Sequence, residues 1–159
     1  MSIPIPMPIS LPAIKMVGLA CRTRNQFETA ESSARIPQVW EDFYDKKAIH
    51  KIENIKNPNC IMGVFTKYES DQDGFYTMIL GTEVKEFGHI PEGLIGLSIM
   101  DNQYLLFSGE GELPDSVLDT WENASDFFSE NRDYQRGYTT DIEVYNLDEL
   151  ESVKLYIAV

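Results

Sequence analysis

The chain has 159 residues, and its 26 acidic against 13 basic side chains give a formal net charge of −13. Hydrophobic residues make up 43% and charged residues 25%, which is typical of one folded domain and argues against disorder. A chain this acidic repels phosphates. Nucleic acids and anionic membrane surfaces are therefore disfavoured as partners, and a cationic ligand is favoured.

Residues 1–13 are expected to form an extended lead-in, because proline at nearly every second position favours polyproline or edge-strand backbone. The prolines and the lack of a basic start also argue against a secretory signal. No apolar run is long enough to cross a membrane. Cys21 and Cys60 read as free thiols, although one bridge between them stays open. These features predict a cytoplasmic protein.

The first half of the chain reads as strand, helix, strand, strand. Residues 16–23 have the length and composition of a strand. A helix follows, in which Pro37 suits the first turn. Residues 61–68 and 76–84 read as two further strands, and the polar segment 69–74 joins them as a hairpin loop. The apolar face of the helix is marked by Ile36, Val39, Trp40 and Phe43.

The second half repeats this order. Residues 94–100 form a short apolar strand candidate, interpreted as a connector, and residues 102–109 read as a strand. Residues 141–145 and 153–159 read as the closing strands. The helix between the strand at 102–109 and the closing strands has an apolar face formed by Leu113, Val117, Leu118, Trp121, Ala124 and Phe128. The order predicts an α+β protein with duplicated βαββ halves, about 14–86 and 94–159, in a single domain over 14–159.

The motif search points away from cofactor and metal chemistry. His50 and His89 lack the spacing of metal ligands, and no dinucleotide-binding or phosphate-binding glycine loop is present. We therefore expect no metal site and no cofactor. A groove between two similar halves is instead the favoured place for a small-molecule pocket.

Glu143 is the acidic residue that stands out. Strand alternation places it with Asp141 and Tyr145 on one face, opposite Ile142. Two interpretations stay open. This face is the solvated side of an antiparallel sheet, or it lies in a cleft, where a cationic aromatic ligand would offset the cost of burying the carboxylate.

Aromatic residues on the predicted elements supply ring faces for such a cleft. Core packing is the alternative role for each of them, and periodicity alone leaves the face of several strands open. With Glu143, the candidate ligand-binding residues are Trp40, Tyr68, Tyr76, Tyr104, Phe107, Trp121 and Tyr145.

Six sequence segments resemble, in their order and spacing, those of the GyrI-like small-molecule-binding family. The module of this family is also the effector-binding domain of AraC-type and MerR-type transcription activators. The six segments are RIPQVWEDF at 35–43, VFTKYESDQDGFYTMILGTEV at 64–84, QYLLFSGEG at 103–111, a helix around Trp121, DIEVYN at 141–146 and KLYIAV at 154–159. The resemblance covers residues 15–159. It implies an antiparallel sheet with two helices, pseudo-twofold symmetry and a central ligand cleft.

The resemblance carries three residues over. The glutamate at the floor of the family's cleft, which multidrug-sensing members use to pair with cationic aromatic compounds, matches Glu143. The helix tryptophan matches Trp40, and the aromatic after the hairpin glycine matches Tyr76. Some members have a second acidic residue near the start of the last strand; Lys154 stands there in this chain, which argues against a doubly acidic pocket.

Because only the proline-rich segment precedes the module, the chain resembles a stand-alone member. The leading hypothesis is a protein that captures a flat, apolar, cationic small molecule in an aromatic cleft without chemistry. One alternative is a hydrolase of strained, cyclopropane-bearing natural products, in which Glu143 acts as general base and Tyr76 as proton donor. A second is a protein–protein modulator that resembles the gyrase inhibitor of the family. The oligomeric state is left open.

Overall fold

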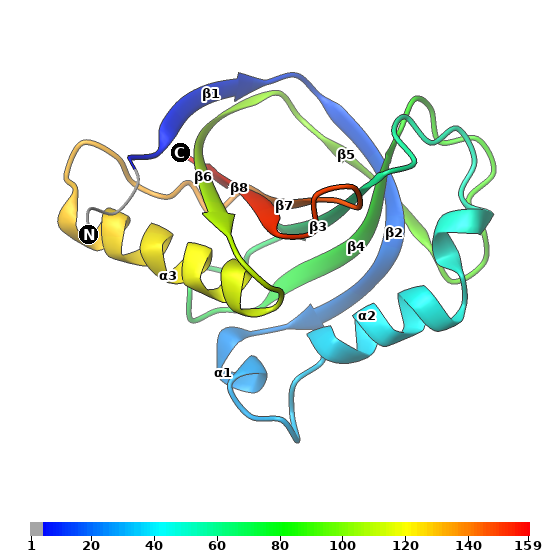
Figure 1. Ribbon diagram of the computed structural model, residues 1–159, viewed down its shortest axis with the longest axis horizontal. Helices are drawn as coiled ribbons and strands as arrows, with labels where there is room; N and C mark the ends of the chain where they lie inside the picture. Colours follow the sequence, from blue (N-terminus) through cyan, green and yellow to red (C-terminus); the bar gives the residue numbers. More distant parts are fainter. Residues whose placement is uncertain (1–4) are drawn as a thin grey trace.

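The computed structural model describes residues 5–159, so residues 1–4 of the expected lead-in lie outside the described residues. Within 5–159, eight strands form one antiparallel sheet in the order β1-β6-β8-β7-β3-β4-β2-β5. The sheet is strongly curled, and its two ends approach each other at the β1–β2 and β5–β6 connections (Figure 1). The strands are β1 Met7–Leu11, β2 Ile14–Thr23, β3 Cys60–Thr66, β4 Tyr76–Val84, β5 Ile95–Ile99, β6 Asn102–Glu110, β7 Thr140–Asn146 and β8 Ser152–Ala158.

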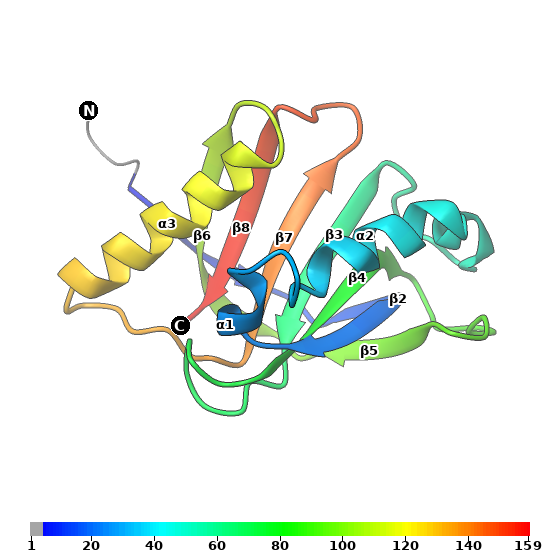
Figure 2. The same cartoon turned by 90° about the horizontal axis from the view of Figure 1, so that it is seen from below.

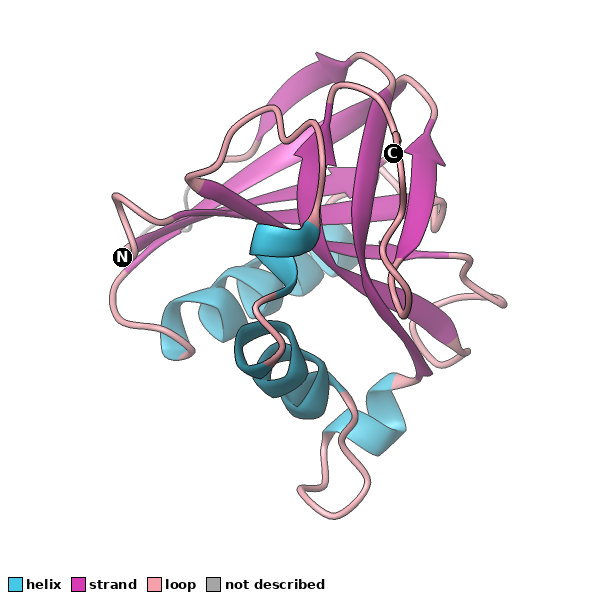
Figure 3. Cartoon of the chain, turned by 90° about the vertical axis from the view of Figure 1, so that its right-hand side faces the viewer, coloured by secondary structure: helices cyan, strands magenta, loops and turns pink. Residues whose placement is uncertain are grey.

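The helices all lie on one side of this sheet (Figure 3). Helix α2 packs on β2 and β4, and helix α3 packs on β6 and β8, side by side across the strands (Figure 2). The helices are α1 Asn25–Glu28, α2 Ile36–Asp45 and α3 Asp115–Glu130, with a 3₁₀ turn at Ala48–Lys51. The two amphipathic helices predicted from periodicity are confirmed, whereas the short helix α1 was not predicted. In the described chain, no helix is both long and apolar enough to span a bilayer.

Helix α2 begins where its sequence indicates. Pro37 occupies the first turn, where its missing N–H leaves no hydrogen bond unmade. The carboxylate of Glu28, at the end of α1, accepts hydrogen bonds from the backbone N–H groups of Arg35 and Ile36, each at 3.0 Å. Negative charge at a helix N-terminus is stabilising, so Glu28 ties the short helix α1 to the start of α2.

The duplication is confirmed, and each half contains one strand more than predicted. The three central strands of each half lie together, β3-β4-β2 and β6-β8-β7, and β3 pairs with β7 at the junction. The extra strands are exchanged between the halves: β1 precedes β2 but pairs with β6, and β5 precedes β6 but pairs with β2. The segment interpreted as a connector is therefore edge strand β5. Residues 7–11 of the expected lead-in are edge strand β1, which belongs to the sheet.

The alternation of each strand gives the sheet two apolar faces. The helix face lies under α2 and α3, and the inner face lies inside the curl of the sheet. Asp141, Glu143 and Tyr145 of β7 point to the helix face, whereas Ile142 points to the inner face and packs with Met62 and Val64. Both faces are buried, which decides between the two interpretations of β7: the polar side of this strand is covered.

Candidate functional site

Glu143 lies at the centre of the helix face and is 6% exposed. Its Oε2 accepts a hydrogen bond of 2.6 Å from the indole N–H of Trp121 on α3, and its Oε1 accepts one of 2.7 Å from the hydroxyl of Tyr145. Both donors are neutral. Neither ion pair recorded among residues 5–159, Lys56–Glu83 and Arg136–Asp141, includes Glu143.

Burial sets the protonation of this acid. Removing the carboxylate from water raises the pKa of Glu143, and the hydrogen bonds from Trp121 and Tyr145 lower it by less than burial raises it. Burial also raises the pKa of Tyr145, so its hydroxyl keeps its proton and remains a donor to Glu143. The site therefore holds an acid whose charge is unfavourable until a positive group comes near.

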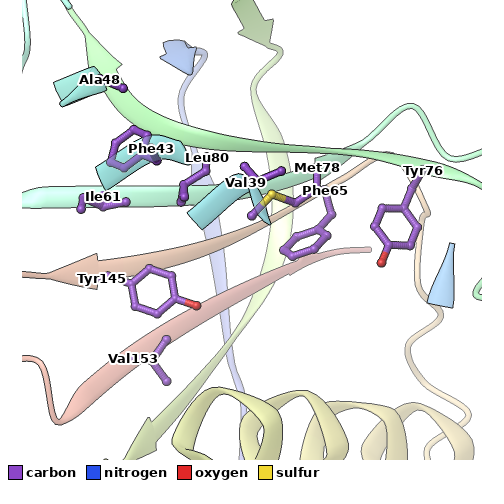
Figure 4. Close-up of a cluster of buried hydrophobic side chains, with 10 residues drawn as sticks. All are labelled: Val39, Phe43, Ala48, Ile61, Phe65, Tyr76, Met78, Leu80, Tyr145 and Val153. Carbon is purple, nitrogen blue, oxygen red and sulfur yellow. The ribbon is translucent and has the colours of Figure 1, made fainter. Parts of the chain in front are cut away.

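Aromatic rings continue on both sides of Glu143. On the α2 side, the ring of Trp40 meets that of Tyr145 edge to face, with centroids 5.2 Å apart. On the α3 side, Trp121 meets Phe65 edge to face at 5.3 Å. Phe65 in turn lies beside Tyr76 with centroids 5.7 Å apart (Figure 4). These side chains come from both helices and from β3, β4 and β7, so both halves of the chain supply the wall.

The structure thus brings together six of the candidate residues, the buried acid Glu143 and five aromatic residues around it. Tyr68 joins the wall through Tyr76, with ring centroids 5.8 Å apart, and its hydroxyl donates to Asp141. The six are Trp40, Tyr68, Tyr76, Trp121, Glu143 and Tyr145. Phe65 belongs to the same wall but was not among the candidates chosen from the sequence.

Two predicted residues lie elsewhere. Tyr104 points to the inner face, as does its register partner Ala158 on β8. Its ring packs there against that of Tyr156. Phe107 is on the helix face but packs against Phe127 and Phe128 of α3. Tyr104 is therefore separated from Glu143 by the sheet, and Phe107 packs α3 against the sheet.

The carboxylate of Glu143, expected at the floor of the cleft, is covered by neighbouring side chains in this structure. The indole N–H of Trp121 contacts Glu143 Oε2, and two hollows in the described part of the chain lie elsewhere. One of about 620 Å³ is lined by Glu110, Gly111 and residues 148–152, and one of about 260 Å³ lies beside Met7 and Phe107. A ligand that reaches Glu143 must therefore move Trp121.

The arrangement gives little support to Tyr76 as a proton donor that acts together with Glu143. The hydroxyl of Tyr76 donates to Asn25 Oδ1 at 3.1 Å, so it is not directed at the carboxylate. Burial raises the pKa of Tyr76 as well, which makes it a poorer proton donor. The hydrolase hypothesis stays a prediction from the resemblance.

Gly63 leaves the space that the Glu143 carboxylate occupies. The two residues are direct partners on neighbouring strands, and a Cβ at position 63 would lie 2.9 Å from Glu143 Oε1. Gly63→Ala is expected to push this oxygen off the Tyr145 hydroxyl and to lower the free energy of unfolding by about 1–3 kcal/mol. Urea denaturation measures the change. Gly137→Ala is the control, because its Cβ would meet nothing closer than 3.5 Å; equal losses in both variants would contradict the expectation.

Comparison with known proteins agrees with this fold. The structure of the integron cassette protein VCH_CASS2 of Vibrio cholerae is similar, with a TM-score of 0.80 and 26% identity over 98% of this chain and 95% of that one. The structure of SAV2435 bound to tetraphenylphosphonium has a TM-score of 0.76 at 14% identity over 97% of this chain and 93% of that one, which shows a common fold.

Curated relatives carry the names of transcriptional regulators. YobU of Bacillus subtilis is 24% identical over 91% of each chain. BrlR of Pseudomonas aeruginosa is 24% identical over 95% of this chain, which spans about half of BrlR, 54% of its length. The family model described as "Integron-associated effector binding protein" matches residues 9–159. The resemblance stated from the sequence is thereby confirmed, and the chain belongs to the family of integron-associated effector binding proteins.

Proposed function

We propose that the protein binds an apolar aromatic cation between α2 and α3, with Glu143 as the counter-charge. The observation that carries this proposal is that no residue within 5–159 forms an ion pair with the Glu143 carboxylate, which is 6% exposed. A buried charge with only neutral donors is costly, and a cation brought beside it removes that cost. A small molecule of this kind suits the family, and SAV2435, of the same fold, has a structure bound to tetraphenylphosphonium.

The ring wall accounts for the apolar part of such a ligand. Trp40, Phe65, Tyr76 and Trp121 offer faces and edges against which aromatic groups pack, and tyrosine and tryptophan faces also attract positive charge. Glu143 supplies selectivity for cations over neutral compounds of the same shape. The net charge of −13 adds a long-range attraction for the same ligands.

Glu143→Gln tests the proposal, because it keeps the shape and one acceptor oxygen but removes the charge. Tetraphenylphosphonium is expected to bind the variant about tenfold to a hundredfold more weakly. The neutral triphenylphosphine oxide is expected to bind both proteins within about twofold of each other. Isothermal titration calorimetry measures both affinities.

Glu122→Gln provides the control, since Glu122 is an exposed residue one position from Trp121 on α3. It makes the same change in net charge and is expected to leave both affinities unaltered. Equal loss in the two variants would reduce the role of Glu143 to a general field effect. Unchanged affinity in Glu143→Gln would overturn the proposal.

A further inference from the structure

Arg136 lies in the loop between α3 and β7, and its guanidinium is surrounded by aromatic rings. The guanidinium carbon is 4.3 Å from the ring centroid of Tyr138, 5.8 Å from that of Trp121 and 5.9 Å from that of Tyr68. The side chain is 17% exposed and is paired with the buried Asp141 at 2.7 Å. Several aromatic faces around one positive charge are the arrangement with which proteins recognise cationic ligands.

This cation adjoins the Glu143 site through Trp121. The indole N–H of Trp121 donates to Glu143, while the face of the same ring carries the guanidinium of Arg136. Both contacts act on the side chain of Trp121, so Arg136 helps to hold the indole ring in place against Glu143. Moving Trp121 aside means giving up its contact with Arg136.

Hydrogen bonds tie the loop of Arg136 to the other half of the molecule. The hydroxyl of Tyr138 donates to Gln72 Oε1 at 2.7 Å, in the loop between β3 and β4. The side-chain amide of Asn25 donates to the backbone oxygen of Gln72 at 3.0 Å, and Asn25 accepts from Tyr76. The segment around Arg136 is thus joined to α1 and to the ring wall at the same end of the sheet.

One polar atom of Arg136 is left over in this arrangement. Nε is buried and has no hydrogen-bond partner among the described residues, although the terminal nitrogen Nη2 bonds to Asp141. A buried donor without a partner weakens the hold of the protein on the guanidinium. The rings of Tyr68, Trp121 and Tyr138 are therefore matched to a positive charge, while one N–H donor of the guanidinium that now lies there has no partner among the described residues.

We infer that Tyr68, Trp121 and Tyr138 form a cation subsite of the ligand site, and that Arg136 occupies this subsite as a resident cation until a ligand cation displaces it. The inference rests on the proposed function, because it assigns a specificity-determining role within the same site. It also explains why Glu143 is covered at rest: the resident cation and Trp121 close the site together.

The double variant Arg136→Met/Asp141→Asn tests the inference, because it removes the resident cation without leaving Asp141 as an unpaired buried charge and without changing the net charge. Tetraphenylphosphonium is expected to bind it about threefold to tenfold more tightly than the parent chain. Triphenylphosphine oxide, which gains no cation–π contact, is expected to change by less than about twofold. Weaker cation binding, or an equal gain for both compounds, would overturn the inference.

A ligand-free readout separates this inference from the proposed function. Exchange of the Trp121 indole N–H with solvent, followed by NMR, is expected to become faster in the double variant, while Trp40 serves as internal reference. If no form of the protein binds tetraphenylphosphonium, the proposed function fails and this exchange alone decides about Arg136. An unchanged Trp121 rate would then reject its role.

Two further variants complete the design. Arg132→Met removes an exposed arginine from the same loop and is expected to alter neither affinity nor exchange. Arg136→Lys keeps the charge beside Asp141 but loses the planar group that stacks on the rings. It is expected to shift cation affinity and indole exchange in the same direction as the double variant by a smaller factor, so it decides the matter if the double variant does not fold.

Discussion

Asp141→Ala is expected to lower the free energy of unfolding by about 3–5 kcal/mol, because it removes one partner of a buried ion pair. Asp141 is 0% exposed and accepts hydrogen bonds from Arg136, from the Tyr68 hydroxyl and from the backbone N–H of Ala158. Alanine leaves all three donors without an acceptor, one of them charged. Urea denaturation followed by circular dichroism measures the loss.

The contacts of Asp141 explain why this loss reaches the whole domain. It joins the loop of Arg136 to β7, the end of β8 to β7, and Tyr68 of the first half to the second half. Asp119→Ala is the matched control, since Asp119 is exposed on α3, and its loss is expected to stay within about 0.5 kcal/mol. A loss of that small size for Asp141→Ala would show that Arg136 and Tyr68 find other partners.

The elements with strong local periodicity were predictable from the sequence. The helix around Trp40 and the strand at 76–84 are found where the apolar spacing placed them, because each buries one face on its neighbours. Alternation in β7 also placed Glu143 and Ile142 on opposite faces correctly. These features depend on residues within a few positions of one another, which a single sequence displays.

The exchange of edge strands was not predictable in this way. Strand β1 contains Pro8 and β5 is short, so neither has the alternation of a half-buried strand. Each is held by pairing with a strand of the other half, β1 with β6 and β5 with β2. Their partners lie far along the chain or across the duplication, and local composition carries no signal for such pairing.

The residues of the candidate site also divide into those with a signal in the sequence and those that only the tertiary structure places. Glu143 stood out by strand alternation, and the family resemblance supported Glu143, Trp40 and Tyr76; the structure places all three along one wall. Arg136 lies in a loop without periodicity, so nothing in the sequence joined it to Asp141. Tyr104 was chosen for its residue type, and the register of β6 with β8 is what turns it to the inner face. A usable signal existed only for Asp141, which alternation placed beside Glu143.

Glu143→Gln is expected to stabilise the ligand-free protein by at least about 1 kcal/mol at pH 8, although it weakens cation binding. Burial raises the pKa of Glu143 in the folded state above its value in the unfolded chain. The folded state therefore holds the proton more tightly, and stability falls as the pH rises from the ordinary glutamate pKa of about 4.3 through the folded pKa. Glutamine removes this loss, since its oxygen accepts from Trp121 and its amide donates to Tyr145.

The pH dependence of stability distinguishes the cost of burying the Glu143 carboxylate from a general effect of the change in net charge. The stability difference between Glu143→Gln and the parent chain is expected to be small near pH 4 and to grow as the pH rises, until the folded pKa is passed. Urea denaturation between pH 4 and pH 8 measures it, and Glu122→Gln on the surface of α3 is expected to show no such growth. A difference that stays constant or shrinks with rising pH would mean that the carboxylate has a positive partner at rest. That result would remove the physical reason for a cation to bind beside Glu143.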